Sequence, residues 1–184
     1  MHTETKIAFG GGCHWCTEAV FQSLLGVIKV EQGFVASIDE NSEFSEAVII
    51  HFDAAKISLG VLIEIHLHTH KSTSNHSMRN KYRSAIYTFS EAQKHEATGQ
   101  LELLQFQFQN ELITQVLPFD KFRASRAQIQ NYYYKNPKKP FCESFINPKL
   151  LTLLKRFSKY TNQNKLKHLK DESREIKHTK HQGS

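Results

Sequence analysis

Two cysteines near the start of the chain stand in a setting that favours thiol chemistry. Cys13 follows a short apolar run and three glycines, and Cys16 comes three residues later in the segment GGGCHWC. A cysteine at the start of a helix is close to unpaired backbone N–H groups, which stabilise a thiolate. The glycines allow a tight turn and the close approach of a ligand. We therefore expect Cys13 to be an exposed nucleophile with a lowered pKa. Cys16 is near enough to form a disulfide with it or to share a metal ion.

A metal site and a simple dithiol site are two alternatives for these cysteines. A structural zinc site needs four ligands, and Cys142 brings the number of sulfurs in the chain only to three. The histidines at 66, 68 and 70 do not share one helix face, so at most two of them could converge. We expect no metal. A thioredoxin-like disulfide oxidoreductase also uses a CxxC motif, but it requires a thioredoxin topology, which the order of elements described next does not support.

The elements that must position these cysteines follow the order strand, helix, strand, strand, helix, strand. Apolar and β-branched runs predict strands, and apolar residues at helical spacing predict helices. The strands are expected at 6–10, 27–37, 46–52 and 83–89, and the helices at 18–25 and 57–68. This order predicts an α+β fold, a ferredoxin-like two-layer βαββαβ core with helices on one face of a mainly antiparallel sheet.

Additional helices and one more strand are expected after this core. A long amphipathic helix is predicted at 91–110, followed by a strand at 112–119 and a helix at 123–135. The Asn136-Pro137 pair stops that helix, and the stretch up to Pro148 is expected to be irregular. An apolar helix at 150–157 is the last predicted element.

The composition indicates one folded catalytic domain, residues 1–160, followed by a basic tail, residues 161–184. The chain has 184 residues, of which 39% are hydrophobic and 11% aromatic, enough for a single core. The tail contains six basic and three acidic residues and therefore contributes half of the net charge of +6. Because it has only three aliphatic residues, we expect it to be flexible.

The charge and hydropathy patterns also exclude several partners. The body of the protein is only mildly basic, so we expect no nucleic-acid partner. No apolar run approaches the roughly 20 residues that a membrane span requires, so we expect no membrane partner. The first residues, MHTETKIAFGGG, have neither a basic region nor a long apolar region. Cytoplasmic localisation is therefore expected.

Several segments, in the same order, resemble the A-type peptide methionine sulfoxide reductases. FGGGCHWCTEAVFQSLLGV is similar to the GCFW segment of that family and the helix after it. SEAVIIHFD and KYRSAIY are similar to two further family segments, and QNYYYKNPKKPFCESFINPKL resembles the ending of some members. The resemblance covers about residues 6 to 150. It implies thiol-dependent reduction of methionine S-sulfoxide, in proteins or free, without a cofactor and with a thioredoxin-like reductant. We expect a monomer.

The resemblance also implies roles for individual residues. Cys13 matches the nucleophile that attacks the sulfoxide sulfur, and Trp15 matches the indole that holds the substrate methyl group. Glu46 matches the carboxylic acid that protonates the sulfoxide oxygen, a role that requires a carboxyl kept protonated in a partly apolar pocket. Tyr82 matches a tyrosine whose phenol binds the same oxygen.

Two cysteines are candidates for the step that follows. Attack by Cys13 leaves a sulfenic acid, which a second thiol converts to a disulfide. Cys16 is favoured as the resolving residue because it is within one helical turn of Cys13. Cys142 is the alternative, and in the predicted irregular segment it would have to be delivered by a chain movement.

Three departures from the family pattern fall in the substrate-binding region. His14 replaces a phenylalanine beside Trp15, Phe34 stands where many members have a tyrosine, and Ser77 stands where an aspartate is usual. A polar, titratable ring at position 14 changes half of an apolar methyl clamp. Two other functions therefore stay open beside sulfoxide reduction. One is a general CxxC disulfide oxidoreductase, and the other is a non-catalytic relative that binds methionine peptides or a metal.

Overall fold

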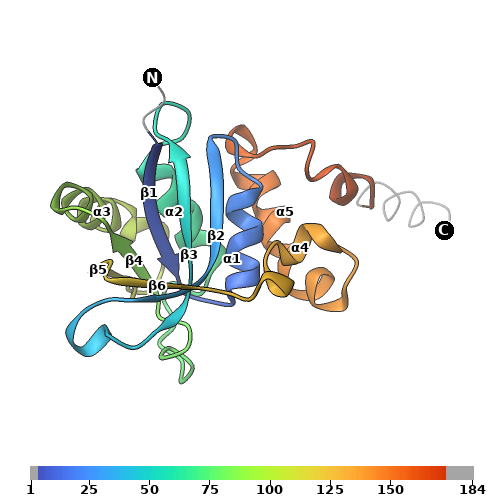
Figure 1. The fold of residues 1–184 in the computed structure, drawn as a ribbon. Helices are drawn as coiled ribbons and strands as arrows, with labels where there is room; N and C mark the ends of the chain where they lie inside the picture. Colours follow the sequence, from blue (N-terminus) through green and yellow to red (C-terminus); the bar gives the residue numbers. More distant parts are fainter. Residues whose placement is uncertain (1–3, 173–184) are drawn as a thin grey trace.

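Six strands form one sheet at the centre of the protein (Figure 1). The computed structural model describes residues 4–172. The strand order is β5-β4-β1-β3-β2-β6, in which β4 and β5 are parallel and the other neighbours are antiparallel. The bounds are β1 Glu4–Gly10, β2 Val27–Ala36, β3 Ser45–Asp53, β4 Ala85–Thr88, β5 Gln115–Pro118 and β6 Lys121–Ala124.

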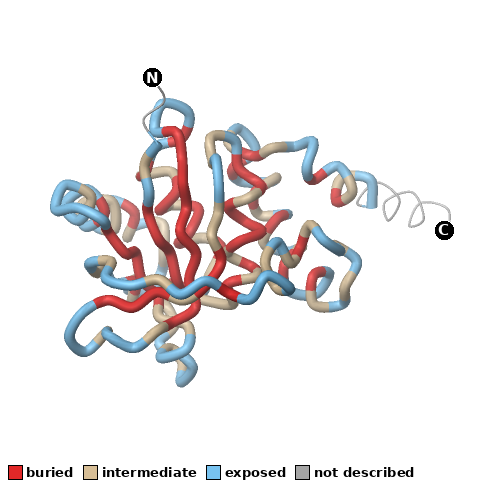
Figure 2. Tube along the Cα trace, viewed as in Figure 1, coloured by how far each residue is buried: buried red, intermediate tan, exposed pale blue. Residues whose placement is uncertain are grey.

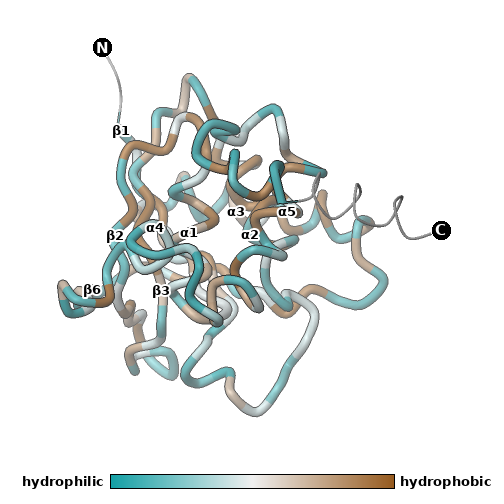
Figure 3. Tube along the Cα trace, turned by 90° about the vertical axis from the view of Figure 1, so that its right-hand side faces the viewer, coloured by the Kyte–Doolittle hydropathy of each residue, from teal (hydrophilic) through white to brown (hydrophobic). Residues whose placement is uncertain are grey.

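The four central strands and two helices form the predicted βαββαβ core. The labelled α-helices are α1 His14–Gln22, α2 Leu59–Thr69, α3 Glu91–Leu104, α4 Tyr132–Lys135 and α5 Asn147–Arg156, and residues 167–172 are also helical. Helix α1 connects β1 to β2, and α2 connects β3 to β4. The central order β4-β1-β3-β2 is that of a ferredoxin-like sheet. In the side view, β1, β2, β3 and β6 lie on one side of the molecule and α2, α3 and α5 on the other (Figure 3). The predicted fold class is confirmed.

The main core lies between the sheet and the helices. Alternate residues of the central strands point to this face, among them Phe9 and Ile50, and they pack against Phe21 of α1 and Leu62 of α2. The opposite face carries a smaller cluster that includes Tyr87. The central strands and the inner faces of the helices are accordingly buried (Figure 2). This packing fixes the end of β1 relative to the start of α1, where the predicted nucleophile lies.

The segment after α3 differs from the prediction in two places. The expected helix at 123–135 is wrong over most of its length, because its first residues belong to β6 and only Tyr132–Lys135 is α-helical. Strand β6 pairs with residues 33–36 of β2, a long-range contact that overrides a weak local helix preference. The stretch expected to be irregular contains a π-helical turn, Cys142–Ile146, that leads directly into α5.

The expected flexible tail also packs differently over its first part. Leu166 and Leu169 are buried and belong to the main core. The hydroxyl of Tyr133 is 2.8 Å from Nε2 of His168, and Lys165 Nζ donates a hydrogen bond to the backbone oxygen of Gln22. A few aliphatic residues are therefore sufficient to attach residues 161–172 to the body. The remainder of the predicted tail, residues 173–184, lies outside the described residues.

Substitution of Leu166 tests this attachment. Leu166 is fully buried, so we expect Leu166→Ala to lower the free energy of unfolding by about 2–5 kcal/mol, the usual effect of such a change in a core. Lys167 is exposed and provides a matched control, with an expected change within about 0.5 kcal/mol for Lys167→Ala. Urea unfolding measures both. Equal stability of the two variants would mean that the segment does not pack on the domain.

No helix in residues 4–172 combines the length and the apolar composition that crossing a membrane requires.

Candidate active site

A glycine turn joins β1 to α1 and places Cys13 at the N-cap of the helix. Gly11 has a φ of +153°, and a Cβ built on it would lie 2.4 Å from Cδ2 of His70. A Cβ on Gly10 would lie 2.9 Å from the backbone oxygen of Arg83. Larger residues would therefore push this turn away from its neighbours. The backbone oxygen of Cys13 accepts the first hydrogen bonds of α1, from the N–H groups of Cys16 and Thr17.

The environment of Cys13 favours its thiolate. The neighbouring thiol of Cys16 lowers the pKa of Cys13 by hydrogen bonding to its sulfur. The backbone N–H of Trp15 acts in the same direction, whereas burial and the negative charge of Glu46 oppose it, and the net effect is a lowered pKa. The Cys13 side chain is partly exposed. A sulfur that is both accessible and easily ionised is the form of cysteine that reacts as a nucleophile.

The other two cysteines are buried close to Cys13. The hydrogen bond to Cys13 and burial raise the pKa of Cys16, so it remains a thiol. Cys142, on the π-helical turn, is completely buried in the main core together with Cys16, and burial raises its pKa as well. All three cysteines are free. The segment that contains Cys142 was predicted to be irregular, but it is an ordered turn packed against α1.

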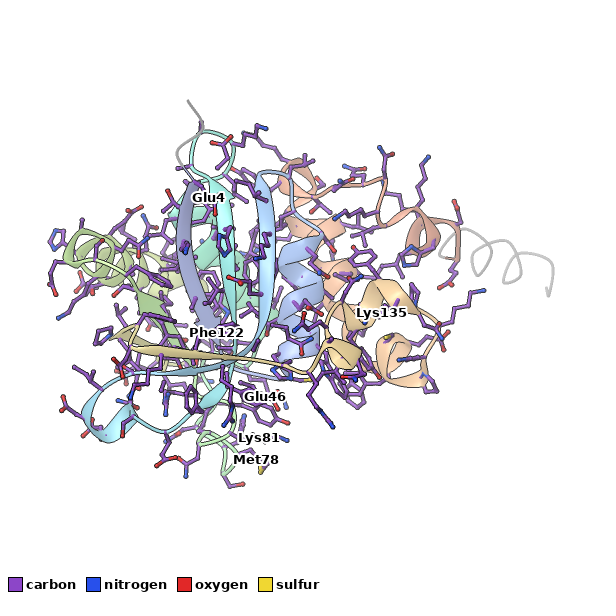
Figure 4. All side chains as sticks on the ribbon, in the orientation of Figure 1. Glu4, Glu46, Met78, Lys81, Phe122 and Lys135 are labelled. Carbon is purple, nitrogen blue, oxygen red and sulfur yellow. The ribbon has the colours of Figure 1, made fainter. Side chains whose placement is uncertain are left out.

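Glu46 is held beside the start of α1 by contacts on both of its oxygens. Its Oε2 accepts a hydrogen bond of 3.0 Å from the backbone N–H of His14. Its Oε1 lies 3.8 Å from Nζ of Lys81, which extends from the loop before β4. Glu46 and Lys81 lie at the same end of the sheet, opposite the end that carries Glu4 (Figure 4). A partly apolar pocket was expected around this carboxyl. The structure instead places one N–H donor and the ammonium group of Lys81 next to it.

Tyr82 lies next to the same lysine. Nζ of Lys81 is 5.0 Å from the centre of the Tyr82 ring, and a hydrogen bond to Tyr82 is the main cause of the raised pKa of Lys81. Arg79 ties this loop to the glycine turn, because its guanidinium donates hydrogen bonds of 2.9 Å to the backbone oxygens of Gly11 and Tyr82. The structure thus brings Tyr82 and Glu46 together through Lys81.

Aromatic rings form a wall beside Cys13. The indole of Trp15 stacks on Tyr132 with ring centres 4.1 Å apart and an angle of 6° between the planes. Phe141 meets Trp15 edge to face at 5.3 Å. Nζ of Lys139 lies 4.3 Å above the Tyr132 ring. Such a wall provides the apolar contact that a methyl group requires.

Glu18 positions this wall and was not identified from the sequence. Its buried carboxylate accepts hydrogen bonds of 3.0 Å from the backbone N–H of Asn131 and 3.1 Å from that of Tyr132. Nε2 of Gln32 donates a further bond of 3.0 Å. Asn131 has a φ of +53°. Glu18 stabilises this turn by accepting hydrogen bonds from the backbone N–H groups of Asn131 and Tyr132. The roles of Tyr132 and Glu18 in the wall depend on their positions near the cysteines in space, which the sequence does not show.

The three departures from the family pattern occupy different positions. His14 is buried, with its ring 5.1 Å from that of Phe34 and 6.5 Å from that of Trp15, measured between ring centres. Phe34 lies opposite Glu46 in the pairing of β2 with β3, on the same face of the sheet. Ser77 is exposed on the loop between α2 and β4 and makes none of the site contacts found in the described residues.

The remaining histidines of α2 support the glycine turn rather than form a ligand cluster. The rings of His66 and His70 stack at 4.1 Å, and Nε2 of His70 is 2.8 Å from Oγ of Ser84. Burial lowers the pKa of His70 to about 3, so its ring is neutral. His68 points to Gln107 instead. Within residues 4–172, no group of three or more His, Cys, Asp or Glu side chains is arranged to hold a metal ion.

The site combines an activated cysteine with a neighbouring carboxyl group and an aromatic wall on a ferredoxin-like sheet. This combination is typical of a cysteine-dependent reductase. Comparison with known proteins specifies the class further. The family model described as peptide methionine sulfoxide reductase matches residues 5–164. The peptide methionine sulfoxide reductase MsrA of Trichodesmium erythraeum is 35% identical over an alignment that covers 82% of this chain and 94% of the relative. The chain therefore belongs to the A-type peptide methionine sulfoxide reductases, the enzymes that reduce methionine S-sulfoxide with a thiol.

Solved structures agree on the fold. Reduced Mxr1 from Saccharomyces cerevisiae has a TM-score of 0.68 at 21% identity and covers 76% of this chain and 89% of its own. Mxr1 solved in complex with Trx2 has a TM-score of 0.56 at 21% identity, with coverage of 70% and 84%. These similarities confirm the α+β architecture independently of the sequence relationship.

Proposed function

We propose that Cys13, Glu46 and Tyr82 carry out the reduction of methionine S-sulfoxide in this chain. The observation that supports this most is the position of Cys13, a partly exposed sulfur with a lowered pKa at the start of α1. Glu46 hydrogen-bonds to the next residue of the same helix. A nucleophile and an acid are thus adjacent, which is what transfer of an oxygen from sulfur to sulfur requires.

The proposed reaction begins with attack of the Cys13 thiolate on the sulfoxide sulfur. Glu46 donates a proton to the sulfoxide oxygen, and the phenol of Tyr82 donates a hydrogen bond to the same atom. The oxygen then passes from the methionine sulfur to the sulfur of Cys13. The bond between the oxygen and the methionine sulfur and the bond between the two sulfurs both break, which leaves methionine and a Cys13 sulfenic acid. Methionine sulfur is reduced and Cys13 is oxidised by the same two electrons.

The aromatic wall is the proposed binding site for the methyl end of the substrate. Trp15 is held between Tyr132 and Phe141, so its ring is fixed before a substrate arrives. Phe34 adds an apolar surface beside Glu46 but offers no hydroxyl group to the sulfoxide oxygen. In this proposal Tyr82 is therefore the phenol that contacts the oxygen. Ser77 is exposed on the loop that carries Lys81 and Tyr82, and the proposal assigns it no role in binding.

Cys16 is the proposed resolving residue. Its thiol attacks the sulfur of the Cys13 sulfenic acid, water leaves, and a Cys13–Cys16 disulfide forms. The two side chains already interact, whereas Cys142 is completely buried on an ordered turn. Partly exposed Cys13 is then the sulfur that a reductant reaches. A thioredoxin fits this role, in agreement with the solved complex of Mxr1 with Trx2.

Mass spectrometry after one turnover tests the resolving step. We expect a Cys13–Cys16 disulfide in the unmodified chain and in Cys142→Ser, because the interacting pair is unaffected. In Cys16→Ser, we expect a sulfenic acid at Cys13 that dimedone traps, or its later capture by Cys142. A dimedone adduct in the unmodified chain, with no disulfide, would contradict resolution within the chain.

Two further properties belong to the proposal. The first is that the working unit is a monomer. Three free cysteines, two of them buried, suit a reducing compartment, which supports the cytoplasm.

The stereochemistry of the substrate tests the proposed function as a whole. The reduced protein is incubated with separated S- and R-sulfoxides of free and peptidyl methionine, without a recycling reductant. We expect close to one methionine per protein from the S-sulfoxide and none from the R-sulfoxide. Product from neither isomer, with peptide binding intact, would indicate a non-catalytic relative.

A further inference from the structure

The ring of His14 is fixed in one orientation behind the proposed acid. Its Nδ1 lies 2.8 Å from the backbone oxygen of Gly33. Because a carbonyl oxygen only accepts hydrogen bonds, Nδ1 carries a hydrogen whether the ring is neutral or charged. Nε2 is therefore the nitrogen that gains or loses a proton. The edge-to-face contact with Phe34 holds the ring in this orientation.

Nε2 of His14 faces the proposed acid. It lies 3.8 Å from Oε2 of Glu46, the same oxygen that accepts the backbone hydrogen bond of His14. Both side chains are largely shielded, with 4% of the His14 side chain and 10% of the Glu46 side chain exposed. Access of bulk water to Glu46 is restricted, and Nε2 of His14 is a titratable nitrogen within ion-pair distance of this oxygen.

We propose that His14 supplies the proton that Glu46 delivers, so that the pair, rather than Glu46 alone, is the acid of this enzyme. The inference rests on the proposed role of Glu46. His14 is a positioning residue, since it acts through Glu46 and does not reach the sulfoxide. When Glu46 gives its proton to the sulfoxide oxygen, the N–H bond at Nε2 breaks and the proton passes to Oε2. The neutral ring regains a proton when the thiol of Cys13 ionises in the next cycle.

Charged and titratable groups from several elements surround the pair. Glu18, on the same helix as His14, interacts with the ring charge, and Cys13 precedes it. Lys81 lies beside the other oxygen of Glu46 and interacts with Tyr82. From β6, the guanidinium of Arg123 lies 4.9 Å from the centre of the Phe34 ring. Glu18 and a Cys13 thiolate are the negative charges near the ring besides Glu46, and Lys81 and Arg123 are the positive ones.

The proposal predicts the alkaline side of the pH profile. An imidazole ordinarily holds its proton to a pH about two units higher than a carboxylic acid does. The proposal therefore requires the rate to be sustained to a higher pH than an isolated carboxyl would allow. His14→Gln can still donate to the carbonyl of Gly33 but cannot carry a proton. In that variant we expect the alkaline limb of the single-turnover rate to move down by about two pH units.

Single-turnover rates with methionine S-sulfoxide from pH 5 to 9 provide the test. At the alkaline end we expect His14→Gln to be slower than the unmodified chain by about 100-fold, which corresponds to the shift of two units, and at pH 5 within a few-fold. His14→Phe, which has an apolar ring of similar shape, should show the same shift. His95→Gln, an exposed histidine on α3, is the matched control and should leave the profile unchanged. Parallel profiles of His14→Gln and the unmodified chain would overturn the proposal.

Nitrogen-15 spectra of the imidazole groups test the geometry without a substitution. We expect the neutral ring of His14 to carry its hydrogen on Nδ1 and to take up a proton at Nε2 on acidification. A neutral ring protonated at Nε2, or one that never charges between pH 5 and 9, would also overturn the proposal. An unmodified chain that forms no methionine at any pH would instead refute the proposed function. The single-turnover rate of the unmodified chain, measured first, separates that outcome from failure of the His14 proposal.

Discussion

Cys13→Ser is expected to abolish single-turnover reduction of methionine S-sulfoxide. A serine hydroxyl at the start of α1 remains protonated at neutral pH, whereas the pKa of the Cys13 thiol is lowered by Cys16 and by the N–H of Trp15. No other sulfur can replace it, since Cys16 and Cys142 are buried and their pKa values are raised. The methionine formed per protein, measured by chromatography after one turnover, should fall from about one to background.

The two remaining cysteines provide the controls for this prediction. Cys16→Ser and Cys142→Ser should each still form close to one methionine per protein, because the chemical step precedes resolution. Cys16→Ser should be somewhat slower at neutral pH, since it removes the thiol that lowers the pKa of Cys13 most. Activity that persists in Cys13→Ser would end the assignment of the nucleophile.

Glu46→Gln is expected to slow the same step by about 10²–10⁴-fold, the usual contribution of a positioned general acid. Glutamine has nearly the same shape and can still accept the hydrogen bond from the backbone of His14, so the fold should be retained. Circular dichroism checks that retention. The measurement is the single-turnover rate with the S-sulfoxide at several pH values.

The same variant separates sulfoxide reduction from simple dithiol exchange. A general CxxC disulfide oxidoreductase needs no acid at position 46, so its exchange rate with a small disulfide should be unaffected by Glu46→Gln. Loss of sulfoxide reduction with dithiol exchange retained would assign Glu46 to the sulfoxide step alone. A change of less than a few-fold in sulfoxide reduction, with a normal fold, would remove Glu46 from the mechanism.

Local patterns were sufficient to predict the core. The glycine run before Cys13, the helical spacing after it and the β-branched strand at 46–52 act over short distances. Each agrees with the observed β1, α1 and β3. The ferredoxin-like order then follows from short connections between neighbouring elements. The same local pattern placed Cys13 at a helix start, where the structure has it.

Long-range pairing is what the sequence did not show. Strand β6 is four residues long and mostly exposed, so its signal is weak, and it forms because β2 offers an edge. Cys142 lies in a stretch with prolines and lysines that resembles a loop, yet its turn is buried against α1. Leu166 and Leu169 are too few to fold a tail alone, but they pack into the core that the rest of the chain forms.

The family resemblance named the chemical groups of the candidate site but not the residues that position them. Cys13, Trp15, Glu46 and Tyr82 were named from sequence, whereas Glu18 was not, because its hydrogen bonds run to a turn more than 100 residues away. His14 was expected beside Trp15 at the pocket mouth. Its side chain is buried, with Nδ1 2.8 Å from the backbone oxygen of Gly33 and Nε2 3.8 Å from Oε2 of Glu46, contacts that the sequence does not show.

The most direct test of the central claim uses the variant Cys16→Ser/Cys142→Ser, in which Cys13 is the remaining thiol. The variant is mixed with one equivalent of methionine S-sulfoxide in the presence of dimedone. Methionine and the modified peptide are then counted. We predict one methionine released for each Cys13 that carries the dimedone adduct of a sulfenic acid. Methionine formed without modification of Cys13, or no methionine from a folded variant, would contradict the proposal that Cys13 takes the oxygen.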